Sequence, residues 1–200
     1  PIVHPAALIR GQWEYDPAQP RYLRRAWSIA TSEEFPPNLL DVTVPPPGGK
    51  IAKTVHEVAA FLGDILIDGC AVACDIEGTG GVLIGIGFTR MDTLAGMYVP
   101  FRDFARPYWS DDDTHTAATW VDRVLASEDV AKIFHNGSSF DVPFLEEIGF
   151  EINNYADDTM VRAWATYHEM PKSLQELAIL YAGLNAWKHT SHVGDEGEGK

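Results

Sequence analysis

Acidic side chains stand directly after an apolar segment in the middle of the chain. Asp75 and Glu77 follow the run Ala71-Val72-Ala73-Cys74 and are separated by one residue. Because side chains alternate along a strand, a strand at this place would point both carboxylates to the same side. Two adjacent carboxylates repel each other unless a cation intervenes, and hard oxygen ligands of this kind suit Mg²⁺ or Mn²⁺. The alternative is a pair of solvated acids at a strand end.

A third acid follows the next apolar segment. Asp141 comes after Asn136-Gly137-Ser138-Ser139-Phe140, which itself follows the apolar residues 130–134. The functional interpretation places Asp141 beside Asp75 and Glu77 as a further metal-facing carboxylate. The alternative is structural: Ser138 and Asp141 have the spacing of a capping box, and an acid in the first turn favours the helix dipole.

The elements that would position these acids alternate between helix and strand. The hydrophobic pattern predicts strands at 71–77, 82–88, 94–101, 130–134 and 150–155. It predicts helices at 20–29, from Thr54 onward, and at 116–126, 138–148, 158–167 and 174–182. The short connections between the first three strands favour an antiparallel meander. The whole pattern is typical of an α/β sheet with helices on its faces, in which ligands gather at strand ends.

Composition limits the classes of function. The 200 residues, 46% of them hydrophobic, allow one domain with a core. Residues 1–50 hold five of the 15 basic and five of the 29 acidic residues, so the rest of the chain carries the whole charge of −14. Such an acidic domain is a poor candidate for coating DNA, and we expect it to meet nucleic acid through bound metal ions. No apolar run is long enough to span a membrane, and a cytoplasmic location, in a bacterial or phage-infected cell, is expected.

The ordered set of motifs resembles the DEDD superfamily of 3′–5′ exonucleases. Asp75-Ile76-Glu77, then Asn136 and Phe140-Asp141, match its first two motifs in their strand and helix contexts. Asp158-Thr159-Met160 and the segment 171–178 are similar to proofreading domains of family A DNA polymerases and their phage relatives. The resemblance covers about residues 51–190. It implies a ribonuclease-H-like mixed sheet with helices on both faces.

The resemblance also implies a reaction and a set of roles. The reaction is two-metal hydrolysis of the terminal phosphodiester of DNA, at single-stranded 3′ ends, in replication or repair. Asp75 would bridge two Mg²⁺ or Mn²⁺ ions, Glu77 would bind the ion that carries the attacking water, and Asp141 would hold the second ion. The supporting positions implied are Asn136 and Phe140, and those that approach the terminal nucleotide are Gly78, Thr79 and Gly80.

The family's third motif, Tyr-x-x-x-Asp or His-x-x-x-x-Asp on a late helix, has no match in this sequence. We therefore expect that the exonuclease domain, residues 51–200, is truncated at its C-terminal end and that the activity of this chain is impaired. Two alternatives stay open. The domain is a catalytically inactive binding or scaffold module, or it is an RNA-trimming exonuclease of the same superfamily.

The first residues carry a second, shorter resemblance. The segment from His4 to Arg10 is similar to the second motif of phage-type uracil-DNA glycosylases, with His4 and Arg10 at matching positions. This implies that residues 1–43 are the remnant of a glycosylase domain and that the parent protein carries a fused glycosylase or polymerase domain. The prolines and glycines of residues 44–50 independently indicate a linker. The alternative is a linker peptide with an incidental His-Pro pair.

Overall fold

The structure of the chain is a computed structural model, and it describes residues 49–103, 106–166 and 172–178. The predictions for the first 48 residues, among them the helix at 20–29 and the glycosylase remnant with His4 and Arg10, lie outside this part. The chain divides into two compact units. One comprises Val44–Thr159, and the other comprises Pro1–Thr43 with Met160–Lys200.

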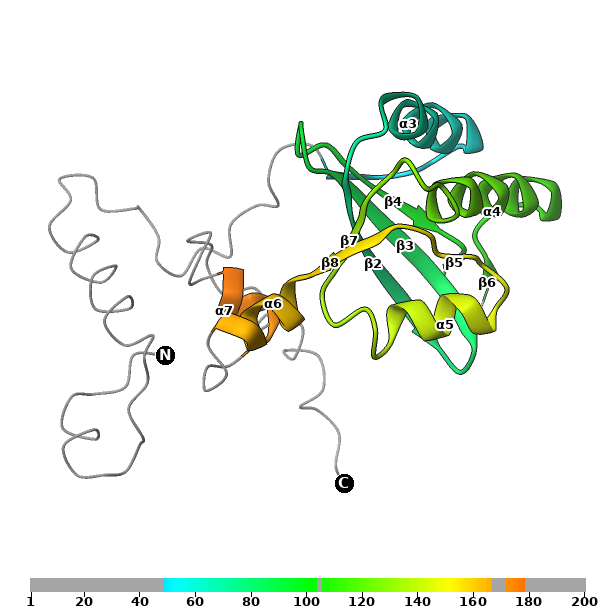
Figure 1. Cartoon of the computed structure of the whole chain (residues 1–200). Coiled ribbons are helices and arrows are strands. Elements are labelled where there is room, and N and C mark those ends of the chain that lie inside the picture. Colours follow the sequence, from blue (N-terminus) through cyan, green and yellow to red (C-terminus); the bar gives the residue numbers. More distant parts are fainter. Residues whose placement is uncertain (1–48, 104–105, 167–171, 179–200) are drawn as a thin grey trace, which may run out of the picture. The chain divides into compact units, whose positions relative to one another are not determined.

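The larger unit is built on a six-stranded mixed sheet with the strand order β1-β4-β3-β2-β7-β8 (Figure 1). The strands are β1 (Gly49–Ile51), β2 (Val72–Thr79), β3 (Val82–Arg90), β4 (Gly96–Pro100), β7 (Lys132–Phe134) and β8 (Tyr155–Asp158). The central three form the predicted antiparallel meander, whereas β1, β7 and β8 pair in parallel with their neighbours. A separate small hairpin follows β4 and consists of β5 (Arg102–Asp103) and β6 (Arg106–Pro107).

The turn between β2 and β3 explains two of its glycines. Thr79 pairs with Val82, which leaves Gly80 and Gly81 as the loop, with φ of 56° and 74°. Two-residue hairpin loops favour turns with positive φ at both central positions, and glycine reaches that region without steric cost. The strands predicted at 71–77 and 82–88 are therefore joined by a loop of two glycines, and β2 extends through Gly78 and Thr79.

The described residues of this unit form three helices: α3 (Val55–Asp68), α4 (Asp111–Leu125) and α5 (Asp141–Glu147). The Thr54 side chain caps the start of α3 by accepting from the N–H of Glu57, while the Glu57 carboxylate accepts from the backbone N–H of Lys53 at 2.7 Å. Three acids, Asp111 to Asp113, precede the helix predicted at 116–126. They form the first turn of α4 after the cap Ser110, where the helix dipole favours negative charge.

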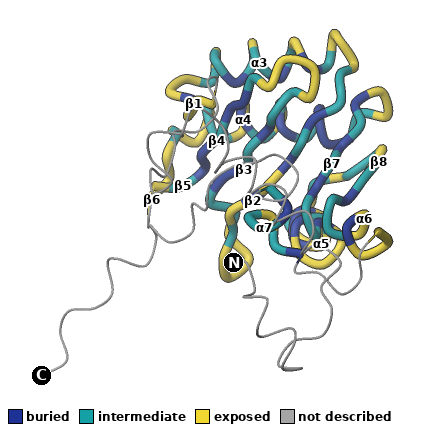
Figure 2. Tube along the Cα trace, turned by 90° about the vertical axis from the view of Figure 1, so that its left-hand side faces the viewer, coloured by how far each residue is buried: buried dark blue, intermediate teal, exposed yellow. Residues whose placement is uncertain are grey.

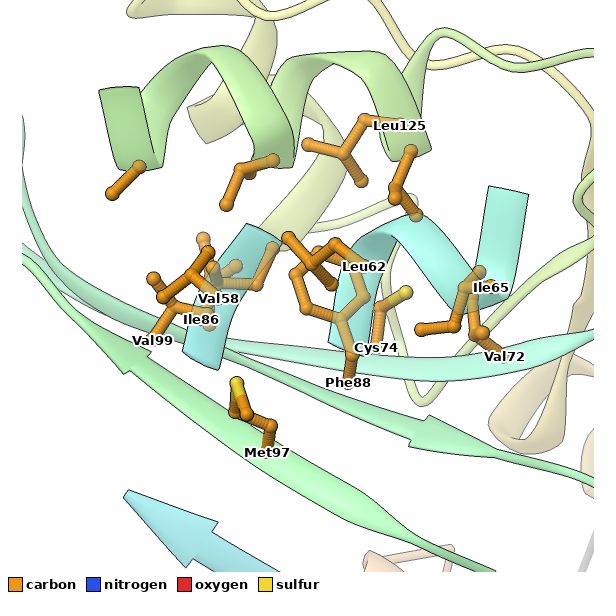
Figure 3. Packing of buried hydrophobic residues seen from close by; sticks show 14 of the residues in the cluster. Val58, Leu62, Ile65, Val72, Cys74, Ile86, Phe88, Met97, Val99 and Leu125 are labelled. Carbon is orange, nitrogen blue, oxygen red and sulfur yellow. The ribbon is translucent and has the colours of Figure 1, made fainter. Parts of the chain in front are cut away.

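The core lies between the sheet and the paired helices α3 and α4. Figure 3 shows side chains of α3, such as Leu62, over side chains of the strands, such as Phe88, with Leu125 of α4 beyond them. Buried and half-buried residues follow the central strands, while exposed residues gather at turns (Figure 2). Along β2 the buried residues are Val72, Cys74 and Ile76, so the alternate residues point away from this core.

One buried cation joins α4 to the sheet. Lys132 of β7 is fully buried, and its ammonium donates to the backbone oxygens of Ser127, at 2.6 Å, and Val124, at 3.4 Å. These carbonyls lie at the C-terminal end of α4, which is the end that attracts positive charge. Burial lowers the pKa of this amine.

Two strands differ from the prediction. The strand expected at 150–155 is displaced to Tyr155–Asp158, because the preceding backbone bonds elsewhere: Asn153 N–H donates to Leu125 O at 3.0 Å. Strand β1 was not predicted, since its residues Gly49 and Lys50 fall within the Pro/Gly-rich segment assigned to a linker. A three-residue edge strand has too few residues for an alternating pattern to be detected.

The smaller unit contains most of α6 (Thr159–Thr166) and all of α7 (Leu174–Leu177). Ser173 caps α7: its hydroxyl accepts from the N–H of Glu176 and donates to the Glu176 carboxylate at 2.7 Å. The Lys172 ammonium lies 3.9 Å from the centroid of the Trp164 ring. Within the described part of the chain, every helix is too short or too polar to cross a bilayer.

Candidate functional site

Asp75 and Glu77 are exposed on β2 and point away from the core formed with α3 and α4. On the neighbouring strand β3, Gly87 lies opposite Asp75 and Gly85 lies opposite Glu77. The two carboxylates therefore share one face of the sheet, as the spacing predicted, and two residues without side chains lie beside them.

Asp141 reaches the same strand from the start of α5. Its Oδ1 accepts a hydrogen bond from the backbone N–H of Ile76 at 3.2 Å. Strand β7 pairs with the beginning of β2, where Val72 N–H donates to Ala131 O, but β7 ends at Phe134. The Asp141 carboxylate takes the place that a carbonyl of the neighbouring strand would have. It thereby lies against the backbone segment that carries Asp75 and Glu77.

The carboxylate of Asp141 is buried, with 5% of the residue exposed. Burial is the main cause that raises its pKa above the ordinary value of 3.8, and nearby Asp158 raises it further. The hydrogen bond from Ile76 and the neighbouring His135 act in the opposite direction. A buried carboxylate of this kind gains from a cation placed beside it.

A second buried acid fixes the loop between β7 and α5. Asp158 accepts from the backbone N–H groups of Asn136 and Gly137, at 2.9 and 2.8 Å. It also accepts from the hydroxyl of Tyr155 at 2.6 Å. Burial, and then this hydrogen bond, raise the pKa of that tyrosine to about 12. The end of β8 thus holds the turn that leads into the helix of Asp141.

Close packing of α5 against β2 depends on a glycine. A β-carbon added to Gly78 would lie 2.6 Å from the Phe144 ring, which is closer than van der Waals contact allows. The ring of Phe144 in turn lies 5.6 Å, between centroids, from the ring of Phe140. The pairing of β2 with β3 shifts between Glu77 and Gly78, so a β-bulge marks the point of contact.

The predicted supporting residues Asn136 and Phe140 lie on the loop before α5 and at its start. Asn136 has a φ of 64°, and its backbone N–H is bound by Asp158. Phe140 is 46% exposed and occupies the N-cap position of α5 without a side-chain cap bond, so Ser138 does not cap this helix as the spacing suggested. Thr79 and Gly80 are exposed at the tip of the β2–β3 hairpin. Contact of this tip with a nucleotide stays a prediction.

The donor set is suited to a hard divalent cation by its chemistry, since all three predicted ligands are carboxylates. Among the described residues, however, no three side chains of His, Cys, Asp or Glu are grouped so that they could hold a metal ion. Two of the acids are exposed, whereas Asp141 has one oxygen engaged by Ile76. The chemical type of these residues suits a divalent cation, but their side chains are not grouped closely enough to surround one.

Sequence reasoning did not identify Tyr98 as a residue of this site. It lies on β4, opposite Gly87, on the same face of the sheet as Asp75 and Glu77. Burial, and then the negative charge of Glu77 and Asp75, raise the pKa of its hydroxyl. The available signal was the Gly-Ile-Gly of the adjacent strand, Gly85 to Gly87, which leaves room for a ring from β4.

No protein-family model and no curated protein matches this sequence. Solved structures do resemble it. Escherichia coli RNase D, an exoribonuclease involved in structured RNA processing, has a TM-score of 0.51 and 16% identity over 72% of this chain and 36% of its own. The Aedes aegypti Nibbler EXO domain has a TM-score of 0.51 and 16% identity over 78% of this chain and 79% of its own. The polymerase domain of M. smegmatis Pol1, in complex with DNA primer-template and dNTP, has a TM-score of 0.53 and 17% identity over 67% of this chain and 22% of its own.

These similarities concern the fold. The chain has the ribonuclease-H-like mixed α/β fold of exonuclease domains, as the sequence predicted. It spans little more than a third of E. coli RNase D, at 36%, and 22% of the Pol1 chain.

Proposed function

We propose that this chain carries a metal-dependent 3′–5′ exonuclease domain that hydrolyses the terminal phosphodiester of a single-stranded nucleic acid. The observation that supports the proposal best is the contact of the Asp141 carboxylate with the backbone of Ile76, between Asp75 and Glu77. This contact supports a site that combines Asp75 and Glu77 of β2 with Asp141 of α5. The likeness of the fold to RNase D and Nibbler supports the same reaction class.

The proposed roles follow from the position of each carboxylate. Asp75 and Glu77 would hold divalent ions from the exposed face of β2, and Asp141 would complete the set from α5. Bound Mg²⁺ or Mn²⁺ would supply a hydroxide ion from bound water and neutralise charge on the leaving oxygen. Ile76 holds one oxygen of Asp141 in place, and Asp158 fixes the loop that precedes α5.

DNA is the substrate we propose first, in replication or repair. The similarity of residues 158–178 to proofreading domains of family A polymerases supports it. RNA is the second candidate, and the resemblance to E. coli RNase D, an exoribonuclease, favours it. Matched DNA and RNA oligonucleotides distinguish the two candidates by their relative rates of degradation.

A catalytically inactive module is the remaining alternative. It is favoured by the lack of a closed group of three metal-binding side chains among the described residues. An inactive module would bind an oligonucleotide without shortening it in Mg²⁺ or Mn²⁺. An exonuclease would produce a ladder of products from the 3′ end.

The decisive experiment uses the full chain and 5′-labelled single-stranded oligonucleotides with Mn²⁺ or Mg²⁺. The ladder should disappear with EDTA and with Asp75→Asn, whose loss should exceed ~100-fold because even outer-shell partners of a metal contribute 10- to 100-fold. Asp64→Asn removes one exposed charge from α3 and should have no effect. Full activity in Asp75→Asn would refute the assignment of the site.

A further inference from the structure

The face of the sheet that carries Asp75 and Glu77 has an aromatic residue beside these acids. Tyr98 of β4 lies opposite Gly87 of β3, and Gly87 lies opposite Asp75 of β2. The three residues form a row across three adjacent strands. Since registered residues of paired strands point to the same face, the ring of Tyr98 and the carboxylate of Asp75 are on the same side.

The Tyr98 side chain does not point straight out from the sheet beside its register partner Gly87. A β-carbon added to Gly85 would collide with the hydroxyl and the ring of Tyr98, although the register partner of Gly85 is Pro100. The phenol therefore leans along β3, and its hydroxyl lies directly over Gly85. Gly85 is the register partner of Glu77, so the hydroxyl is directed toward the row of the second acid.

The hydroxyl is available for a ligand. Among the described residues, the Tyr98 hydroxyl forms no hydrogen bond, and it is not one of the enclosed polar atoms. The ring is half-buried, and it lines a pocket of about 300 Å³ over β1, β3 and β4 that contains none of the three predicted acids. The phenol thus stands between this pocket and the carboxylates of β2.

We propose that Tyr98 is a substrate-contacting residue whose hydroxyl donates a hydrogen bond to a non-bridging oxygen of the phosphodiester bound beside Asp75 and Glu77. This inference rests on the proposed exonuclease function. A phosphate that approaches two carboxylates needs donors on its other oxygens, and a neutral phenol adds a donor without adding charge. The glycines of β3 leave the space through which the ring reaches that position.

A purely structural role makes a different prediction. Aromatic rings that cover glycines on a neighbouring strand stabilise sheets through packing, and phenylalanine serves that purpose as well as tyrosine. Tyr98→Phe keeps the ring over Gly85 and removes only the hydroxyl. The substitution therefore separates the two roles.

The test compares wild type, Tyr98→Phe and the control Tyr108→Phe in the full chain with Mn²⁺. Tyr108 is 39% exposed and lies outside the proposed site. We expect Tyr98→Phe to lower kcat/KM by roughly 10- to 100-fold, as for a lost hydrogen bond to a charged group, with an unchanged thermal unfolding midpoint. Tyr108→Phe should behave as wild type.

A phosphorothioate at the terminal linkage adds a readout that packing would not affect. Sulfur accepts hydrogen bonds poorly, so the loss caused by Tyr98→Phe should shrink for the stereoisomer that carries sulfur at the contacted oxygen. The two isomers, each compared with the all-oxygen substrate, identify which oxygen is contacted. Equal losses for all three substrates would refute a direct contact.

The failures of the two proposals can be told apart. If wild type degrades the oligonucleotide and Asp75→Asn does not, but Tyr98→Phe equals wild type, the role of Tyr98 is refuted and the exonuclease function stands. If wild type neither degrades nor binds the oligonucleotide in Mn²⁺, the exonuclease function fails and the role of Tyr98 fails with it.

Discussion

The Oδ1 atom of Asp141 lies 3.2 Å from the backbone nitrogen of Ile76, the residue that separates Asp75 from Glu77. This hydrogen bond makes the position of α5 depend on β2. A displacement of either element changes the distance between the acids of the first and second sequence motifs. Substitutions that act on this contact should therefore affect stability and activity in separable ways.

Asp141→Asn is expected to stabilise the fold while it lowers activity. Burial raises the pKa of the folded-state carboxyl above the ordinary value of 3.8, so the unfolded chain releases this proton first as the pH rises. The ionised carboxyl then destabilises the folded state at pH 7, whereas below pH 3.8 both states are protonated. Asparagine retains an oxygen for the Ile76 N–H without the charge.

Thermal unfolding in EDTA at several pH values measures this effect. The unfolding midpoint of Asp141→Asn should exceed that of wild type at pH 7, and the difference should vanish below pH 3.8. Asp64→Asn on the exposed side of α3 is the control. A lower midpoint for Asp141→Asn at pH 7 would contradict the argument from burial.

Gly78→Ala should disrupt the packing of α5 on β2. The added β-carbon would lie 2.6 Å from the Phe144 ring, so the ring and the helix must move. Overpacking of this kind costs about 1–3 kcal/mol, and we expect activity to fall because Asp141 moves with α5. Chemical denaturation and the oligonucleotide assay measure the two effects.

Gly49→Ala is the matched control, since a β-carbon there would meet no atom within 4 Å. Phe144→Leu, added to Gly78→Ala, should restore part of the lost activity by making room for the methyl group. If Gly78→Ala is as stable and as active as Gly49→Ala, the contact does not position Asp141.

Asp158→Ala should destabilise the protein by about 2–4 kcal/mol, because it leaves the N–H groups of Asn136 and Gly137 without their acceptor. Tyr155→Phe removes one hydrogen bond to the same carboxylate and should cost ~1 kcal/mol. Urea denaturation gives both values. Similar losses for the two variants would show that the loop does not depend on the carboxylate.

Asn136 offers a test of backbone against side chain. Its φ of 64° is reached by glycine freely, by asparagine at little cost, and by alanine at a cost of ~1 kcal/mol. Asn136→Gly should therefore be about as stable as wild type, and Asn136→Ala should be less stable. If Asn136→Gly is stable but inactive, the side chain has a role in the reaction that the backbone does not explain.

The fold was largely predictable because its elements carry strong local signals. The Thr54 cap of α3, the glycine turn at Gly80 and the alternation along β2 each specify structure within a few residues. Strand β1 and the start of β8 carry no such signal. Their positions depend on partners far along the chain, such as Gly96 for Gly49.

The same distinction applies to the site. Asp75 and Glu77 could be placed on one face from spacing alone. The contact of Asp141 with Ile76 could not, because it depends on β7 ending at Phe134 and leaving the N–H of Ile76 without a partner strand. The bond of Asp158 to the loop after β7 could not be predicted, since Ser138 offered a plausible local cap that the helix does not use. Tyr98 became a candidate only when its register with Gly87 and its lean over Gly85 were known.

The Tyr98 ring occupies the space that a side chain at position 85 would need, so substitutions at the two positions should depend on each other. A β-carbon at position 85 would force the Tyr98 ring to shift, whereas a smaller residue at position 98 leaves room for a side chain at position 85. Homologues without the ring can therefore accept other residues at position 85, whereas in homologues that keep the ring such residues would displace it. In a library randomised at positions 85 and 98, variants that fold should combine a large residue at 85 only with a small residue at 98.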